Sequence, residues 1–108
     1  MNQKLDFKAL SRDPDAYEGE YYEFSGKVLQ VLEEKVGDLT YTELRVATRS
    51  GYDDIVYVLY LRQKAENRIL EDDNVKVSGQ FKGLTSYESI FGETITLPMF
   101  MAESVTLR

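Results

Sequence analysis

Alternating apolar and polar residues recur along most of the chain and predict a protein built from β-strands. Five such runs lie between turns rich in glycine and acidic residues, at residues 20–33, 40–49, 55–61, 75–82 and 93–107. The run at 55–61 is apolar at every position, so each of its two faces should either be covered by the rest of the protein or serve as a contact surface. If Val56, Val58 and Tyr60 face the core, the residues between them face outward.

Two short helical turns are predicted before the first strand. Residues 5–10 place apolar side chains at helical spacing. At residues 13–19, Asp13 can accept from free backbone N–H groups and Pro14 suits the first helical position. Gly19 can adopt the left-handed backbone conformation that ends a helix. We expect these turns to cover one end of a barrel.

Two similar segments predict how the sheet closes. Residues 24–28 (FSGKV) and 77–81 (VSGQF) each place a glycine inside a strand, where glycine marks a bulge or a sharp bend. Gly26 and Gly79 therefore predict two strands that coil, which is what a small barrel needs to close. The adjacent Ser25 and Ser78 have no base to activate them and are not candidate nucleophiles.

Two segments between the strands are less regular. Residues 62–70 are mildly helical and basic, and residues 83–92 are predicted to form a loop that carries several apolar side chains. Pro98 interrupts the last strand and indicates an edge or a bulge there.

The amino-acid composition excludes several kinds of chemistry but does not identify a function. With 108 residues, 43% of them hydrophobic and 30% charged, the chain is the size of one globular domain. The prediction is a single domain over 1–108, with helical turns at 1–19 and a barrel at 20–108. Cysteine and histidine are both absent, which excludes thiol chemistry and the commonest general base. The net charge of −6 argues against broad nucleic-acid binding.

The segments at 70–79 (LEDDNVKVSG) and 17–28 (YEGEYYEFSGKV) resemble the strands of a small OB-fold domain. The lead-in at 13–19 and the strand at 52–58 fit the same pattern. The resemblance is to the tRNA-anticodon-binding-like group found on Gram-positive lipoproteins and surface-anchored proteins. It implies an all-β fold with a short N-terminal helix, a five-stranded OB-like Greek-key barrel, and no transferable catalytic set.

OB-fold modules bind across their second and third strands, flanked by the loops that join strands 1–2 and 4–5. On this chain the plan places a binding surface on the outward residues of 40–61 and on the segment at 83–92. The candidate residues are Tyr41, Arg45, Arg49, Tyr57, Leu59, Tyr87 and Phe91. We prefer a protein partner or a homodimer as the ligand, because exposed apolar patches usually mark such contacts.

The alternative is single-stranded nucleic acid, which binds to aromatic rings interleaved with arginines. Nearby carboxylates, which repel phosphates, argue against it: Glu43, Asp53, Asp54, Glu88 and Glu93. A third interpretation is that the aromatic side chains belong to the hydrophobic core and bind no ligand.

No catalytic residue, metal site or cofactor is predicted. The acidic pairs and triplets at 33–34, 53–54 and 71–73 lack the alternating spacing of a calcium loop and indicate solvated turns. No run approaches a membrane span, and residues 1–5 do not lead into a signal-peptide core. We expect a cytoplasmic protein if the chain is complete, and an extracellular or cell-surface one if it belongs to a lipoprotein-like precursor.

Overall fold

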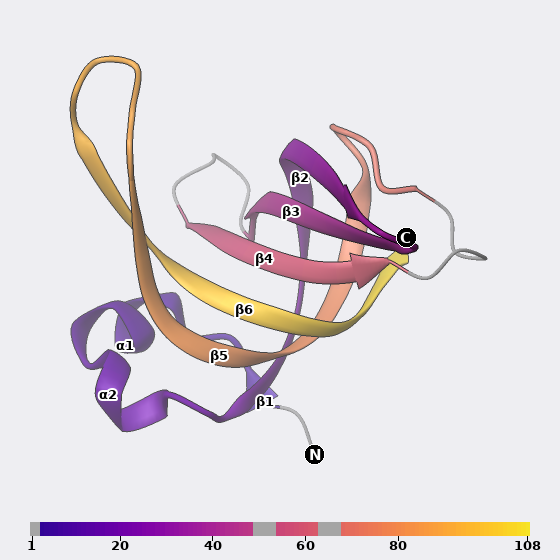
Figure 1. The fold of residues 1–108 in the computed structure, drawn as a ribbon. Helices are drawn as coiled ribbons and strands as arrows, with labels where there is room; N and C mark the ends of the chain where they lie inside the picture. The colour runs from indigo at the N-terminus through magenta and orange to yellow at the C-terminus, as the bar shows by residue number, and fades with distance from the viewer. Residues whose placement is uncertain (1–2, 49–53, 63–67) are drawn as a thin grey trace.

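The computed structural model describes residues 3–48, 54–62 and 68–108, which form two short helices and six strands (Figure 1). In chain order these are β1 (Gln3–Lys4), α1 (Phe7–Arg12), α2 (Pro14–Tyr17), β2 (Tyr21–Val36), β3 (Leu39–Ala47), β4 (Ile55–Arg62), β5 (Asn74–Glu88) and β6 (Thr94–Leu107).

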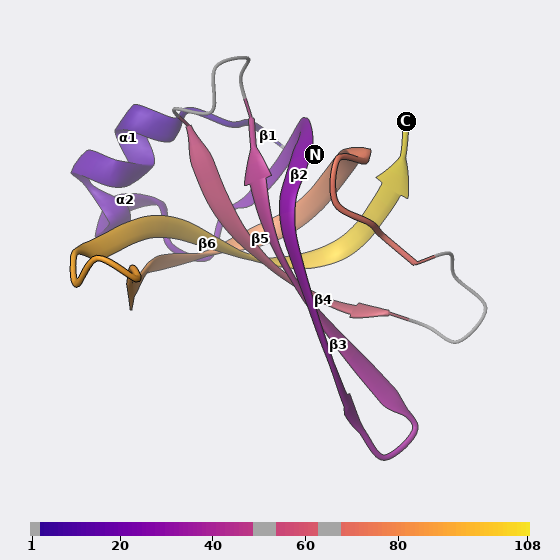
Figure 2. The ribbon, with the colours of Figure 1, turned by 90° about the horizontal axis from the view of Figure 1, so that it is seen from above.

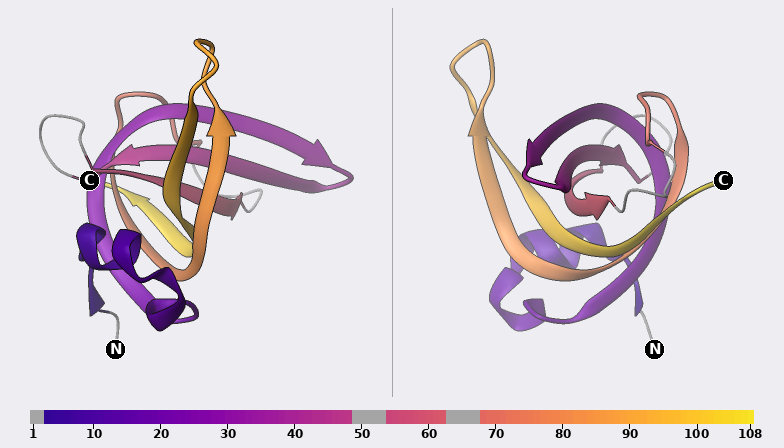
Figure 3. Two further views of the ribbon diagram at one scale, coloured as in Figure 1. Left: turned by 90° about the vertical axis from the view of Figure 1, so that its left-hand side faces the viewer. Right: turned by 45° about the vertical axis from the view of Figure 1, so that its right-hand side comes forward.

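Five of the strands close into a ring. The sheet runs β2–β3–β4–β6–β5, and β5 then pairs with the first half of β2 (Figure 3, right). These pairings are antiparallel except for β4 with β6, which is parallel. The all-β barrel predicted from the sequence is confirmed. The two-residue β1, which pairs in parallel with β2, was not predicted.

The barrel interior is filled by one side of each strand. Leu44 and Val46 of β3 and Val56 and Val58 of β4 are fully buried, and they pack against an aromatic group centred on Phe100. The ring of Phe100 lies 5.0–6.0 Å, centroid to centroid, from those of Tyr22, Phe24 and Phe81. Such tilted and edge-on aromatic pairs stabilise a core beyond their buried area.

Gly26 and Gly79, which we call the glycine corner, lie on neighbouring strands as predicted. Tyr22 is the register partner of Gly79, and Gly26 that of Val75. A Cβ on Gly26 would lie 2.4 Å from the carbonyl oxygen of Ala47, and one on Gly79 would lie 2.7 Å from that of Met101. Here β2 passes from β5 to β3, and β6 bulges against β5, so backbones approach too closely for any side chain.

The helical turns pack under β5 and β6 (Figures 1 and 2). The first begins at Phe7 rather than at Leu5, because the Asp6 side chain caps it by accepting from the backbone N–H of Ala9. Leu10 is inserted into the core. The second begins at Pro14 with Asp13 at its N-cap, as predicted, but the predicted hydrogen bond from a backbone N–H to the Asp13 side chain is not formed.

Two hairpins extend beyond the barrel in different directions (Figure 3, left). The β2–β3 arm (residues 31–44) turns at residues 37–38, as predicted. Glu33 anchors it: the Nε atoms of Arg62 and Arg68 donate to the Glu33 carboxylate over 3.1 and 3.0 Å. Burial raises the pKa of Glu33, but the two arginines outweigh it and hold that pKa below its ordinary value.

The β5–β6 arm (residues 84–98) corrects the predicted loop at 83–92. Leu84 pairs with Pro98 and Tyr87 with Ile95, so β5 continues six residues past its predicted end and only the tip turns. The edge or bulge predicted at Pro98 corresponds to a register shift between Phe81 and Leu84, whose extra residue lies on β5, while β6 itself continues through Pro98. Most of the predicted helical segment at 62–70 lies outside the described residues. Its described part is not helical: Arg62 ends β4, and residues 68–70 form neither helix nor strand.

Candidate nucleic-acid interface

The outer face of β3 and β4 alternates with the buried one, as the sequence pattern predicts. Thr42, Leu44 and Val46 point inward, and so do Val56, Val58 and Tyr60 of the paired strand. The residues between them point away from the core and remain half-buried or exposed. We call them the outer face: Tyr41, Glu43, Arg45, Ile55, Tyr57, Leu59 and Leu61.

Arg45 lies at the centre of this surface. Its register partner on β4 is Tyr57, and its guanidinium carbon lies 3.8 Å from the ring centroid of Tyr87 on the β5–β6 arm. The arm therefore leans toward β3, although β4 and β6 separate β3 from β5 in the sheet. An arginine over a tyrosine ring is a favourable cation–π pair. Within the described part of the chain, no hydrogen bond or ion pair occupies the N–H groups of Arg45.

Tyr57 and Glu43 lie close to each other on the same surface. Burial, and with it the nearby Glu43 carboxylate, raises the pKa of Tyr57 well above its ordinary value of 10.0, so the hydroxyl keeps its proton at neutral pH. Tyr57 therefore places a neutral ring beside Arg45, its register partner on β3.

Two methionines of β6 extend the outer face. Met99 is the register partner of Tyr57, and Met101 that of Leu59. The Met101 side chain is 39% exposed, and Met99 is half-buried. Neither methionine is among the residues predicted from the sequence, although alternation around the buried Phe100 could have identified both.

The tip of the β5–β6 arm is an ordered turn with two exposed apolar side chains. The Ser89 hydroxyl accepts from the backbone N–H groups of Phe91 and Glu93, over 3.3 and 3.2 Å. Ile90 is 94% exposed and Phe91 84% exposed. Neither side chain helps to form the core, so both are free to contact a ligand or a partner.

The structure brings together only part of the predicted site. Arg45, Tyr57 and Tyr87 form one cluster, with Leu59 next to it on β4. Tyr41 lies further along β3, opposite Leu61. Phe91 lies at the arm tip, and Arg49 is outside the described residues. Glu43, considered at first only as a charge that repels phosphate, lies inside the cluster.

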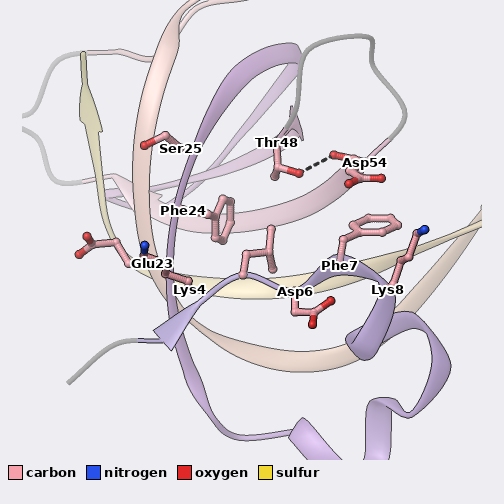
Figure 4. A pocket seen from close by; sticks show the side chains of 10 residues that line it. Lys4, Asp6, Phe7, Lys8, Glu23, Phe24, Ser25, Thr48 and Asp54 are labelled. Atoms are coloured by element: carbon pink, nitrogen blue, oxygen red, sulfur yellow. Dashed lines mark hydrogen bonds between the residues drawn. The ribbon is translucent and has the colours of Figure 1, made fainter.

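A separate hollow of about 630 Å³ lies between the N-terminal segment and the barrel (Figure 4). The rings of Phe7 and Phe24 face it, and at its rim the Thr48 hydroxyl donates to the backbone carbonyl of Asp54 over 2.9 Å. Two lysines and three carboxylates line it: Lys4, Lys8, Asp6, Glu23 and Asp54. This mixture of charges favours neither an anion nor a cation.

Among the described residues, no group of three or more acidic side chains is placed to hold a metal ion. No helix in the described part of the chain is long and apolar enough to span a membrane.

Comparisons with known proteins support the fold. The chain matches no protein-family model and no curated protein sequence. Among solved structures it is similar to the second single-stranded DNA binding protein (SSBb) of Mycobacterium smegmatis. The TM-score is 0.55 and the sequence identity 18%, over 82% of this chain and 84% of that one. Together with the closed five-stranded ring, this similarity identifies an OB fold.

Proposed function

We propose that this protein binds single-stranded nucleic acid across the outer face of β3 and β4, beside the β5–β6 arm. The observation that carries the proposal is the cluster of Arg45, Tyr57 and Tyr87, two rings beside an arginine whose N–H groups have no hydrogen-bond or ion-pair partner among the described residues. Stacked bases and an arginine that meets a phosphate are the contacts that single strands make with OB folds. The similarity to a protein described as binding single-stranded DNA supports the same reading.

The role is one of binding rather than catalysis. The outer face offers aromatic rings, an arginine and one carboxylate, and the chain has no histidine or cysteine to act as base or nucleophile. The narrower resemblance to the tRNA-anticodon-binding-like group of Gram-positive surface proteins stays a prediction, and the proposal does not depend on it.

A titration of labelled oligonucleotide tests the proposal. Fluorescence anisotropy should detect binding of a mixed-sequence single strand of roughly 15 nucleotides at low ionic strength, since phosphate contacts weaken as salt rises. Replacing both Tyr57 and Leu59 with serine should weaken binding by roughly fivefold or more, because each lost base stack is worth about 1–3 kcal/mol. Circular dichroism should show that the double variant keeps its fold.

Tyr21→Ser is the matched control. Tyr21 is also an exposed tyrosine on a strand, at 40% exposure, but it lies on β2 opposite Gln80 of β5. This variant should bind like the wild type. Equal losses in the Tyr21 and Tyr57 variants would place the interface elsewhere, and no binding at low salt would remove the proposal.

A protein partner or a second copy of the chain is the second candidate. The exposed pair Ile90 and Phe91 favours it, because apolar side chains at an ordered tip are typical of contact surfaces. If the folded protein binds no oligonucleotide, this reading becomes the better one.

A further inference from the structure

Glu43 holds an unusual place for a carboxylate on a nucleic-acid surface. Its register partners are Leu32 on β2 and Leu59 on β4, so it is flanked by apolar side chains on both sides. It is half-buried, and the Glu43 carboxylate makes no hydrogen bond or ion pair with another side chain among the described residues. A partly desolvated carboxylate with unused lone pairs gains from any further donor that reaches it.

Arg45 supplies the opposite polarity on the same surface. It lies two residues further along β3, roughly 7 Å from Glu43 on the same face. Because the Tyr87 ring holds its guanidinium from one side, the orientation of the planar group is restrained while its N–H groups stay unused among the described residues. The outer face therefore presents an acceptor, Glu43, next to a donor of restrained orientation, Arg45.

A carboxylate next to an arginine can distinguish the bases by their edges. Cytosine, adenine and guanine each carry an amino group that donates and, close to it, an atom that accepts. Thymine and uracil have a carbonyl oxygen, O4, where cytosine has its amino group. A carboxylate accepts from the amino group and repels the O4 oxygen, whereas an arginine donates to the neighbouring acceptor.

We propose that Glu43 and Arg45 select bases with an amino group, so that the protein prefers cytosine-containing single strands to thymine-containing ones. This inference rests on the proposed function and names its substrate class. It also gives the carboxylate a role: Glu43 disfavours phosphate at the centre of the outer face and so favours an arrangement in which bases, not the backbone, lie against it.

The test compares oligo-dC with oligo-dT of equal length, roughly 12 nucleotides, by anisotropy at one salt concentration. Both ligands carry the same charge, so their affinity ratio reports contacts to the bases and not to the phosphates. The wild type should bind oligo-dC about tenfold more tightly, the size of one well-made base contact. An oligo-dC with two methyl groups on each N4 atom lacks the donor and should lose that advantage without any change to the protein.

Two variants locate the effect. Glu43→Gln keeps the shape but adds an amide donor that suits O4, so the ratio should fall to within about twofold and the affinity for oligo-dT should rise. Glu88→Gln removes the same charge from the exposed end of β5, and it should strengthen binding of both oligonucleotides while preserving the ratio.

The outcomes are separable. If neither oligonucleotide binds, the proposed function fails. If both bind equally to the wild type, the function stands and the selection by Glu43 is wrong. A preference for oligo-dC that survives in Glu43→Gln would likewise overturn the role of Glu43.

Discussion

The glycine corner and the outer face of β3 and β4 differ in what limits their residues. At the corner, backbone atoms of Ala47 and Met101 occupy the space where a side chain would begin, so only glycine fits. On the outer face no such crowding dictates Arg45, Tyr57 or Glu43, and a barrel of the same shape could carry other side chains there. The repeated segments around Gly26 and Gly79, which form the clearest motif of the sequence, therefore serve to close the barrel. The residues of the candidate binding site belong to no recognisable motif.

The largest effect should come from a side chain at the corner. Gly79→Val forces a Cβ against the Met101 carbonyl and should cost about 3 kcal/mol or more of unfolding free energy, a large part of the total for a small domain. Urea denaturation measures this. The neighbouring Ser78→Ala loses only an exposed 3.4 Å contact with Glu23 and should stay within about 0.5 kcal/mol. Equal stabilities for the two variants would contradict the steric account.

Substitutions at two neighbouring residues of β4 should affect the unfolding free energy and the oligonucleotide affinity separately. Val58 is fully buried and Leu59 points outward. Val58→Ala should lower the unfolding free energy by about 2 kcal/mol through lost burial and a cavity, with oligonucleotide affinity unchanged. Leu59→Ala should cost about 1 kcal/mol or less and weaken binding several-fold. Denaturation and anisotropy of the same preparations give both values, and a reversed pattern would mean that the faces are misassigned.

The smallest expected effect on stability comes from Glu33, whose carboxylate is paired with two arginines. Its pKa in the folded protein lies below the ordinary value of 4.5, so folding favours the charged form. The stabilisation is therefore complete above about pH 5 and is lost as the pH falls through the folded pKa. Glu33→Gln should cost about 1–2 kcal/mol at neutral pH, and the difference from wild type should shrink in acid.

Denaturation at about pH 7 and about pH 3 checks this expectation. The control is Glu103→Gln, an exposed carboxylate of β6 for which the described residues offer no partner. It should leave stability nearly unchanged at both pH values. A constant deficit for Glu33→Gln at every pH would show that its ion pairs do not stabilise the fold.

Several features could be predicted from the sequence because they depend on local pattern. Alternation correctly assigned the buried and outward residues of β3 and β4, since side chains alternate strictly along a strand. Gly26 and Gly79 correctly indicated strands that coil together. The hydrogen bond predicted at Asp13 is not formed, because a suitable residue type does not ensure that the side chain reaches a free N–H group.

Other features depend on which strands become neighbours. Residues 83–88 read as a loop because their apolar and polar residues follow no clear core pattern, yet pairing with 94–98 satisfies their backbone and makes them a strand. Glu43 could be interpreted only as a repelling charge, because the apolar residues that flank it, Leu32 and Leu59, lie on other strands.

The sequence by itself determined the strands, the faces that they bury and the two positions where the barrel must bend, because each of these follows from spacing along the chain. Only the tertiary structure decided that Tyr87 meets Arg45 and that Glu43 lies between two leucines beside it. Arg45 and Tyr87 lie on strands far apart in the chain, and the curvature of the closed sheet brings them together. Glu43 meets its two leucines because β3 pairs with β2 on one side and with β4 on the other.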